Sequence, residues 1–392
     1  MSGSCRACGA SELFAVASFA RQPIASRFKR LATEPDEFFD LEVKGCETCG
    51  LVQLGALPSV EALRPRFDWL RYNEPEAHLD AVASAVAVLA PANQRVVGLT
   101  YKDNSFVERL GRLGFAEAQP DLAARALAGQ TAPWGVETVA HWLGSGAAGQ
   151  AARDAGLVVA RHVLEHCDHP ARAVNALLSW LGKDGLLLVE VPGCREALER
   201  GIPELLWEEH ASYFTAPTLQ RLLLASGAEI VHFSEHHYPF ESSLVAMVRT
   251  AKSSPAELPG DDVLLAQTFG KQVAGKVDAT SHGLRHRKDA GQRTVLFGAG
   301  HLSCAFLSLS SASDCVECVL DDTPQKQGLF MAGTQLPISA TADLPAGEPG
   351  LCLMAVHPSA EEKVHHRLAP LREAGWETAS IFPDSPYAVR WN

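Results

Sequence analysis

Two apolar segments joined by a predicted helix constrain the fold of this chain more than any other feature. Residues 157–160 are apolar, the polar run 161–166 follows them, and Pro170 begins a helical pattern. A second apolar segment, 186–191, comes after the turn 183–185. Strand, helix and strand in this order are typical of a parallel sheet, which binds its ligands at the carboxyl ends of the strands. The chain is therefore predicted to be an α/β protein.

Both of these strands lead into acid–base side chains. The first runs into Arg-His-Val-Leu-Glu-His (161–166), and the second is followed by Trp-Glu-Glu-His-Ala-Ser-Tyr-Phe (207–214). Because parallel strands end at the same edge of a sheet, the two segments would meet over one crevice. We expect the functional site there.

Length and composition favour a globular protein of two or three domains. The 392 residues are 47% hydrophobic and 20% charged, which is ample apolar material for several cores. The net charge of −12 argues against non-specific nucleic-acid binding, which needs a basic surface. No apolar run approaches the roughly 20 residues that span a bilayer, and the first residues lack a signal peptide's apolar core. We therefore expect a cytoplasmic protein with neither a membrane nor a nucleic-acid partner; the oligomeric state stays open.

Four of the ten cysteines form two Cys-x-x-Cys pairs, each followed by a glycine: Cys5, Cys8, Cys46 and Cys49. Two such tight turns can direct four thiolates at one ion and complete a tetrahedral site. The alternatives are reduced thiols without metal, or two disulfides, which a reducing cytosol disfavours. Because four thiolates leave no open coordination position, the predicted zinc is structural. It would hold together residues 1–75, a segment too small to be secure on its own core.

A predicted strand at residues 95–99 is followed by an unusual turn. In a nucleotide-binding fold the first strand ends in a glycine-rich turn, because missing side chains let backbone amides approach the ligand at a helix N-terminus. Here the turn spans residues 100–106, and it contains no glycine after Gly98. The strand and the helix of such a fold are predicted, but without the usual turn between them.

The last third of the chain repeats the α/β pattern. A stretch at 252–262 rich in serine and proline marks a boundary, and residues 294–297 then form a predicted strand that enters the glycine turn 298–300. Two further apolar segments, 316–322 and 350–356, predict a second parallel α/β domain. The glycine turn could cradle a phosphate but is shorter than a full dinucleotide fingerprint.

Several short motifs occur in a fixed order through nearly the whole chain. Besides the cysteine pairs they are Pro-Ile-Ala-Ser-Arg-Phe (23–28), Cys-Gly-Leu-Val-Gln-Leu (49–54), Arg-His-Val-Leu-Glu-His (161–166), Val-Glu-Val-Pro (189–192), Glu-His-Ala-Ser-Tyr-Phe (209–214), Leu-Phe-Gly-Ala-Gly (296–300) and Leu-Asp-Asp-Thr-Pro-Gln-Lys-Gln-Gly (320–328). In these motifs the chain resembles the nucleotide-sugar C-methyltransferases. Those enzymes use S-adenosylmethionine (SAM) to methylate ring carbons of nucleotide-linked keto-deoxysugars.

The resemblance implies three parts: a zinc-binding lobe at 1–75, a class I methyltransferase-like domain at 76–251 and a Rossmann-like domain at 252–392. It also implies that the nucleotide sugar binds in the cleft between them. A proton is removed from the carbon next to the sugar ketone, and the enolate attacks the SAM methyl group, which requires a base and an oxyanion donor. For the third part the resemblance implies a structural or sugar-contacting role rather than a working dehydrogenase.

The resemblance also implies catalytic roles for particular residues. His210 is the expected base, Glu209 its orienting carboxylate, and His166 and Tyr213 belong to the same set. Without the resemblance, a Glu-His dipeptide is more often a surface pair at the start of a helix. Family members often carry tyrosine where this chain has Trp207, so a phenolic donor is lost there.

The cofactor turn departs from the family pattern. Family members have an acid at the end of the first strand, then glycine, Asn-Asp and glycine, and a second acid after the next strand for the ribose hydroxyls. The positions expected to contact SAM here are Gly98, Thr100, Lys102, Asp103, Gln119, Arg161 and His162. Only the aspartate of the turn is kept, and Thr100, Tyr101 and Asn104 would occupy space that backbone and cofactor normally share.

Three functions remain open on the sequence. The first is a SAM-dependent C-methyltransferase with an altered cofactor pocket. The second is a family member that works without SAM and catalyses proton transfer or epimerisation on a sugar nucleotide. The third is a catalytically silent partner that binds a sugar nucleotide or another protein.

Overall fold

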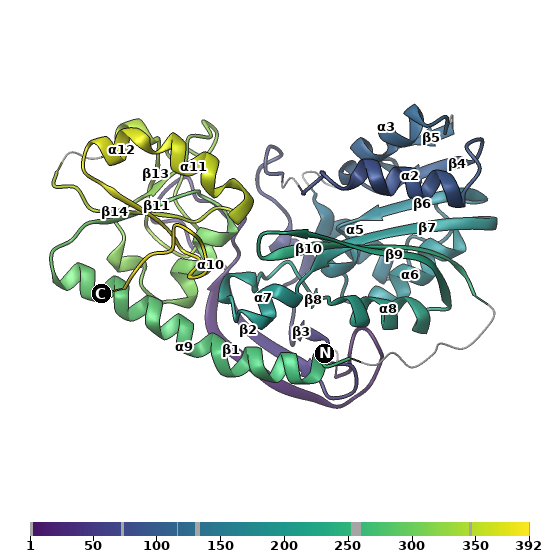
Figure 1. Ribbon diagram of the computed structural model, residues 1–392, viewed down its shortest axis with the longest axis horizontal. Coiled ribbons are helices and arrows are strands. Elements are labelled where there is room, and N and C mark those ends of the chain that lie inside the picture. The colour runs from purple at the N-terminus through teal and green to yellow at the C-terminus, as the bar shows by residue number, and fades with distance from the viewer. Residues whose placement is uncertain are drawn as a thin grey trace.

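The computed structural model describes residues 3–71, 74–115, 117–129, 134–251, 260–344 and 347–391, and folds them around three sheets (Figure 1). Both α/β parts predicted from the sequence are present, which confirms the predicted fold class. Lys252, the predicted first residue of the third part, lies outside the described residues. The three domain ranges therefore stay a prediction.

The first sheet belongs to the N-terminal lobe. It is antiparallel and is built from β1 (Leu13–Pro23), β2 (Phe38–Cys46), β3 (Val52–Leu54) and β8 (Ser212–Tyr213) in that order. A one-turn helix, α1 (Val60–Leu63), follows β3. Because β8 comes from the middle of the chain, the segment around His210 is fastened to the edge of this lobe.

The second sheet has six strands in the order β5-β4-β6-β7-β10-β9. Its strands are β4 (Arg95–Gly98), β5 (Glu117–Gln119), β6 (Ala155–Arg161), β7 (Leu181–Gly193), β9 (Ala228–Tyr238) and β10 (Glu241–Thr250). The first four in the sheet are parallel, as the sequence predicts, whereas β10 and β9 form an antiparallel hairpin that the sequence pattern did not reveal. The predicted turn 183–185 lies inside β7, where Asp184 has a φ of 62°.

Helices cover both faces of this sheet. Its helices are α2 (Leu79–Leu89), α3 (Asn104–Arg112), α4 (Leu122–Ala126), α5 (Val136–Gly144), α6 (Pro170–Ser179), α7 (Arg195–Glu199) and α8 (Ala216–Ala225). Helices α2 and α3 pack with Leu157 and Val159 on one face, and α5, α6 and α8 pack with Val158 and Ala160 on the other. The apolar run in β6 is therefore buried on both sides, as expected for a parallel sheet.

The third sheet is parallel throughout, with the order β13-β12-β11-β14-β15. It contains β11 (Thr294–Phe297), β12 (Val319–Leu320), β13 (Ile338–Ser339), β14 (Leu351–Met354) and β15 (Glu377–Ser380), with α10 (His301–Leu309), α11 (Glu361–Arg367) and α12 (Ala369–Glu373) around it. The 28-residue α9 (Asp262–Asp289) contacts both β1 and β11, so it connects the N-terminal lobe to this domain (Figure 1).

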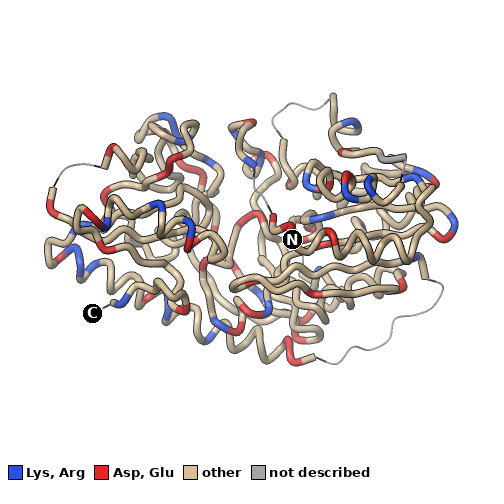
Figure 2. Tube along the Cα trace, turned by 45° about the horizontal axis from the view of Figure 1, so that its top comes forward, with Lys and Arg blue, Asp and Glu red and all other residues tan. Residues whose placement is uncertain are grey.

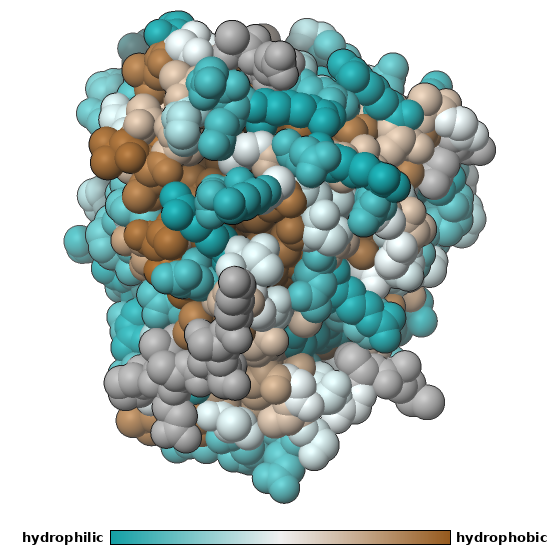
Figure 3. Space-filling view, turned by 90° about the vertical axis from the view of Figure 1, so that its right-hand side faces the viewer, coloured by the Kyte–Doolittle hydropathy of each residue, from teal (hydrophilic) through white to brown (hydrophobic). Residues whose placement is uncertain are grey.

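Basic residues alternate with acidic ones along the chain trace (Figure 2). On the face shown in Figure 3, hydrophobic residues form separate groups among hydrophilic ones. Among the described helices, none combines the length and apolar character that a bilayer crossing requires.

A buried carboxyl group near the junction of the domains gives a stability prediction. Glu204, in the 3-10 turn η3 (Pro203–Leu205), is 5% exposed, and burial raises its pKa to about 7 from 4.5, with Lys276 opposing that rise. The folded chain then keeps a proton that the unfolded chain releases, so stability falls as the pH rises from about 4.5 to 7, by on the order of 3 kcal/mol. We expect Glu204→Gln to remove this loss, measured as the difference in Tm between pH 5 and pH 8. The exposed Glu199→Gln serves as control, and equal pH profiles for both variants would contradict the assignment.

Candidate active site and metal centre

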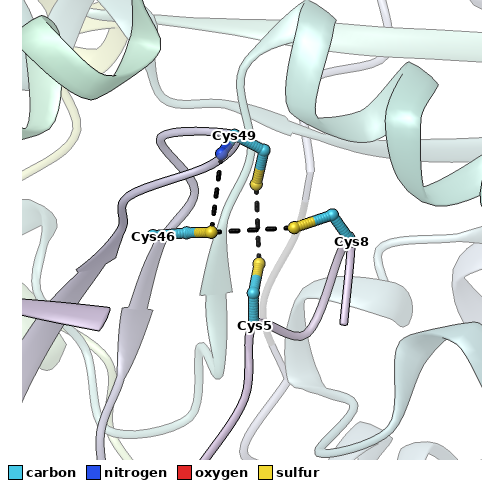
Figure 4. Close-up of side chains that lie close together, drawn as sticks. All are labelled: Cys5, Cys8, Cys46 and Cys49. Atoms are coloured by element: carbon cyan, nitrogen blue, oxygen red, sulfur yellow. Dashed lines mark hydrogen bonds between the residues drawn. The ribbon is translucent and has the colours of Figure 1, made fainter. Parts of the chain in front are cut away.

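The four N-terminal cysteines converge as predicted (Figure 4). The Sγ atoms of Cys5 and Cys49 lie 3.5 Å apart, and those of Cys8 and Cys46 lie 3.6 Å apart. A tetrahedral zinc with bonds of about 2.3 Å separates its sulfur ligands by about 3.8 Å. The cluster therefore has the size of a four-thiolate zinc site.

The two turns that carry these cysteines have the same geometry. The N–H of Gly9 donates to the Cys5 carbonyl and that of Gly50 to the Cys46 carbonyl, both at 2.9 Å. Both glycines have a positive φ, 77° and 76°, which side-chain-bearing residues rarely adopt. Each Cys-x-x-Cys-Gly run is thus a tight turn that points two thiols inward, and the four ligands leave no position for a substrate.

A cavity of about 740 Å³ lies between the second and third sheets. From the second sheet and its connections it is lined by His162, Glu165, Trp207 and His210, and from the third domain by the glycine turn 298–300. The crevice predicted at the ends of the parallel strands is therefore present, and it is closed on the far side by the C-terminal domain.

Three acid–base side chains meet beside this cavity, and two of them, Glu165 and His210, line it. Glu165 and His166 lie in the 3-10 turn η2 (Leu164–His166) after β6, and His210 lies in the loop before β8. One ligand-type atom from each of the three lies within 4.8 Å of the others, and the imidazole rings of His166 and His210 meet edge to face with centroids 4.8 Å apart. The structure thus brings together His166 and His210, as the sequence predicted.

Burial keeps both imidazoles neutral. It lowers the pKa of His166 to about 3, with help from the nearby positive charge of Lys102. Burial and His166 also hold the pKa of His210 well below its usual value, against the attraction of Glu165. A neutral imidazole has a lone pair ready to accept a proton.

Glu209 does not occupy the place predicted for it. Its carboxylate makes no hydrogen bond or ion pair with His210 among the described residues, and it lines a separate small cavity with Tyr101 and Lys102. Burial and the neighbouring Glu208 raise its pKa well above the usual range, which favours a neutral acid. The carboxylate beside His210 is instead that of Glu165, which the sequence analysis did not select.

Tyr213 likewise does not have the catalytic position predicted for it. Its side chain is fully buried in β8, and its hydroxyl donates to the carbonyl of Trp207 at 3.1 Å and accepts from the N–H of Trp207 at 2.9 Å. It lines none of the cavities found around the site. The prediction that Tyr213 acts on the substrate is therefore corrected: it fixes the loop that carries His210.

A second network, of hydrogen bonds around Glu190, lies next to the acid–base cluster. Glu190 of β7 accepts from His162 at 3.1 Å and lies 3.0 Å from His78, and Arg161 Nε donates to its other oxygen. His78 in turn lies 2.7 Å from the hydroxyl of Tyr238. Of these, only His162 and Tyr238 line the large cavity. Glu190 orients His162 as a carboxylate orients a catalytic imidazole, so its motif, Val-Glu-Val-Pro, marks a supporting position.

Comparison with known proteins gives three matches along the chain. Residues 5–63 match a family described as a zinc binding domain, residues 104–233 a methyltransferase domain, and residues 227–383 a C-methyltransferase C-terminal domain. The C-methyltransferase NovU of Streptomyces niveus is 26% identical, covering 85% of this chain and 84% of NovU. The three family matches together extend from residue 5 to residue 383. The chain is accordingly a methyltransferase with a zinc-binding N-terminal region.

The solved structures to which this chain is similar include a cyclase and a methyltransferase. The [4+2]-cyclase SpnF is 14% identical with a TM-score of 0.32, covering 47% of this chain and 85% of SpnF. Magnesium protoporphyrin IX methyltransferase from Synechocystis PCC 6803, solved with SAH, is 14% identical with a TM-score of 0.32, covering 45% of this chain and 83% of its own.

Several of the residues predicted to contact SAM form hydrogen bonds with one another. Asp103 is fully buried, and its carboxylate accepts from the N–H of Thr100 at 2.7 Å and from that of Arg161 at 2.9 Å. The guanidinium of Arg161 donates to the carbonyl of Lys102 at 2.6 Å. Gln119 accepts from Arg95 at 2.8 Å. At Gly98 a Cβ would meet Val107 at 3.1 Å, so this glycine serves packing.

Lys102 is a buried residue of the predicted cofactor turn. Its side chain is 6% exposed and forms an ion pair with Glu74. Burial opposes its charge, but the attraction of Glu74 outweighs this and raises the pKa of Lys102. The cavity left beside Lys102 and Tyr101 has a volume of about 40 Å³, whereas ligand pockets are roughly 300–1,000 Å³. The turn, as arranged here, leaves too little room for SAM beside Lys102, so SAM binding at the turn requires this side chain to move.

This misfit predicts a gain of cofactor affinity on one substitution. Lys102→Asn restores the residue expected from the family pattern and removes the ion pair, while Glu74 keeps His162 as a partner at 3.6 Å. We expect SAM to bind at least about tenfold more tightly than to the unaltered chain, a gain of about 1.4 kcal/mol measured by calorimetry. The exposed Lys183→Asn is the matched control. Unchanged affinity in Lys102→Asn would show that Lys102 does not block the site.

Glu74 and Glu165 are functional candidates that the sequence analysis missed. Glu74 pairs with Lys102 and lines the large cavity, and Glu165 stands beside His210. A usable signal existed only for Glu165, which lies between two histidines at a strand end. Glu74 lies in a stretch with no periodic pattern, so nothing in the sequence places it at the cofactor turn.

Proposed function

We propose that this methyltransferase is a C-methyltransferase that acts on a nucleotide-linked keto-deoxysugar. The observation that carries the proposal is the cluster of Glu165 and His210 at the wall of a cavity of about 740 Å³. That volume lies within the range of pockets for ligands of this size. The carbon acid of a keto sugar needs a base such as this cluster supplies.

In the proposed reaction His210 removes the proton from the carbon next to the ketone. Its neutral imidazole accepts the proton, and the adjacent carboxylate of Glu165 stabilises the imidazolium that forms. His162 lines the same cavity and donates toward the enolate oxygen, held in place by Glu190. SAM would supply the methyl group to the enolate when it is bound.

The wall of the cavity that the third domain forms favours a substrate that carries a nucleotide. The glycine turn 298–300 leads directly into α10, so the first amide groups of that helix lie at the cavity. Helix N-termini attract anions such as a diphosphate. Asp321 is already engaged, because it accepts from the N–H of Ala299 and pairs with Lys326 at 3.0 Å. This arrangement favours a phosphate over the ribose contact of a dinucleotide cofactor.

The test is a proton-exchange and methylation assay on keto-deoxysugar nucleotides. In deuterium oxide, we expect one deuterium to enter the carbon next to the ketone, and with SAM present a product heavier by one methyl group. Mass spectrometry distinguishes the two. A panel of keto-deoxysugar nucleotides that gives neither product with the zinc-loaded enzyme would overturn the proposal.

The closed cofactor turn favours a second candidate, proton transfer without SAM. If Lys102 keeps the turn closed during turnover, the Glu165–His210 cluster would still enolise a keto sugar and return the proton, giving epimerisation. Deuterium uptake that is unchanged by SAM, with no methylated product, would favour this candidate over methyl transfer.

A further inference from the structure

The buried carboxylate of Glu165 is incompletely satisfied. Its side chain is 2% exposed, and its Oε1 lies 3.5 Å from His162 Nδ1 and 3.9 Å from His166 Nε2. Its Oε2 is buried and has no hydrogen-bond partner among the residues that the structure describes. Burying a polar atom without a partner is costly and rare, and an ion or water is a common reason for finding one.

The Glu165 carboxylate and two nearby imidazoles have the chemistry of a ligand set for a metal. Two imidazoles and one carboxylate come from η2 and from the loop before β8, and their ligand atoms lie within 4.8 Å of one another. An ion about 2.1 Å from each ligand separates neighbouring ligands by about 3 Å, so side-chain rotations are enough to close the site. Imidazole with carboxylate suits first-row divalent ions such as zinc, iron, cobalt and nickel.

We propose that Glu165, His166 and His210 bind a divalent transition-metal ion at the cleft, as a second metal site separate from the four-cysteine site. Glu165 and His210 line the large cavity, so the free coordination positions of the ion face the substrate space. His162 contacts Glu165 and is itself held by Glu190, so it orients the carboxylate ligand without binding the ion. An open site of this kind exchanges its ion, whereas the closed four-thiolate site retains its own.

Occupation of this site and proton transfer exclude one another. The ion takes the lone pair with which His210 would accept a proton, so a bound metal switches off the base. This consequence rests on the proposed function, but metal binding does not. Deuterium exchange is therefore expected to stop on addition of the ion and to return when a mild chelator removes it.

The two metal sites can be separated by cobalt spectroscopy. Cobalt in a four-thiolate site gives an intense sulfur-to-metal charge-transfer band, whereas a site of two histidines and one carboxylate gives only weak visible bands. When the zinc-loaded chain is titrated with Co²⁺, we expect weak visible bands that saturate at one additional ion per chain. The sulfur-to-metal charge-transfer band should not appear. A chain that takes up no second ion contradicts the proposal.

Variants locate the second ion. Glu165→Gln is expected to weaken cobalt binding at least about tenfold, because the carboxylate charge is lost. His210→Gln should do the same, and it provides a second variant if Glu165→Gln folds poorly. Glu209→Gln is the matched control, because that neighbouring carboxylate faces the other cavity and should leave cobalt binding unchanged. If both ligand variants bind cobalt as the unaltered chain does, the ion sits elsewhere and the proposal fails. The deuterium-exchange assay tests only the proposed function, whereas cobalt binding is measured in the absence of substrate and tests only the metal site.

Discussion

Replacing His210 by asparagine is expected to reduce deuterium exchange into the keto-sugar nucleotide by about 10²–10⁴-fold, the usual contribution of a general base. Asparagine keeps a polar side chain of similar reach but has no lone pair basic enough to accept the proton. The backbone N–H of His210 donates to the Trp207 carbonyl at 3.0 Å, and this bond remains in the variant. The measurement is the rate of deuterium uptake in the absence of SAM, followed by mass spectrometry.

The neighbouring Glu209→Gln discriminates between two arrangements of the base. The sequence predicted that Glu209 orients His210, whereas the structure puts Glu165 beside His210 and turns Glu209 toward Lys102. We therefore expect Glu209→Gln to change the exchange rate far less than Glu165→Gln does. A loss in Glu209→Gln as large as that in His210→Asn would restore the sequence-based assignment. The melting temperature of each variant is compared with that of the unaltered chain, because a folding defect would also lower the rate.

The sequence predicted what short-range patterns determine. The spacing of Cys5, Cys8, Cys46 and Cys49 predicted the four-thiol cluster, because each pair sits in one tight turn whose geometry is local. The apolar run 157–160 predicted β6, because a strand covered on both faces tolerates no polar residue. In each case the physical cause is contained in a few consecutive residues.

Which residues come together at the site depends on contacts between segments that are distant in the sequence, and the sequence did not reveal them. Glu165 and Glu209 both stand next to a histidine in the sequence, and only the crossing of the two loops decides which carboxylate meets His210. Tyr213 was assigned by motif, but its position in β8 turns the hydroxyl inward to Trp207. Similarly, the departures at the cofactor turn were visible in the sequence, but the ion pair of Lys102 with Glu74 was not.

Loss of the N-terminal metal is expected to disable the distant base, because the first cysteine turn contacts the segment after His166 and, through β3, the strand that follows His210. Arg6, between Cys5 and Cys8, donates to the Leu54 carbonyl at 2.5 Å and to Asp168 at 3.1 Å. Leu54 belongs to β3, which pairs with β8 after His210, and Asp168 follows His166 by two residues. The turn therefore holds both segments that form the acid–base cluster.

Cys46→Ser should release zinc and lower deuterium exchange by about 100-fold, the effect expected when a catalytic group is displaced by about 1 Å. Metal content is measured by elemental analysis and the exchange rate by mass spectrometry. Cys315→Ser is the matched control, since Cys315 is buried in the third domain and lies outside the four-cysteine cluster. A zinc-free Cys46→Ser chain that exchanges deuterium at the normal rate would show that the lobe folds without its metal, and that β3 and Arg6 hold the catalytic loops unaided. Because structural zinc sites contribute on the order of 10 kcal/mol to the folding of small metal domains, we expect the opposite.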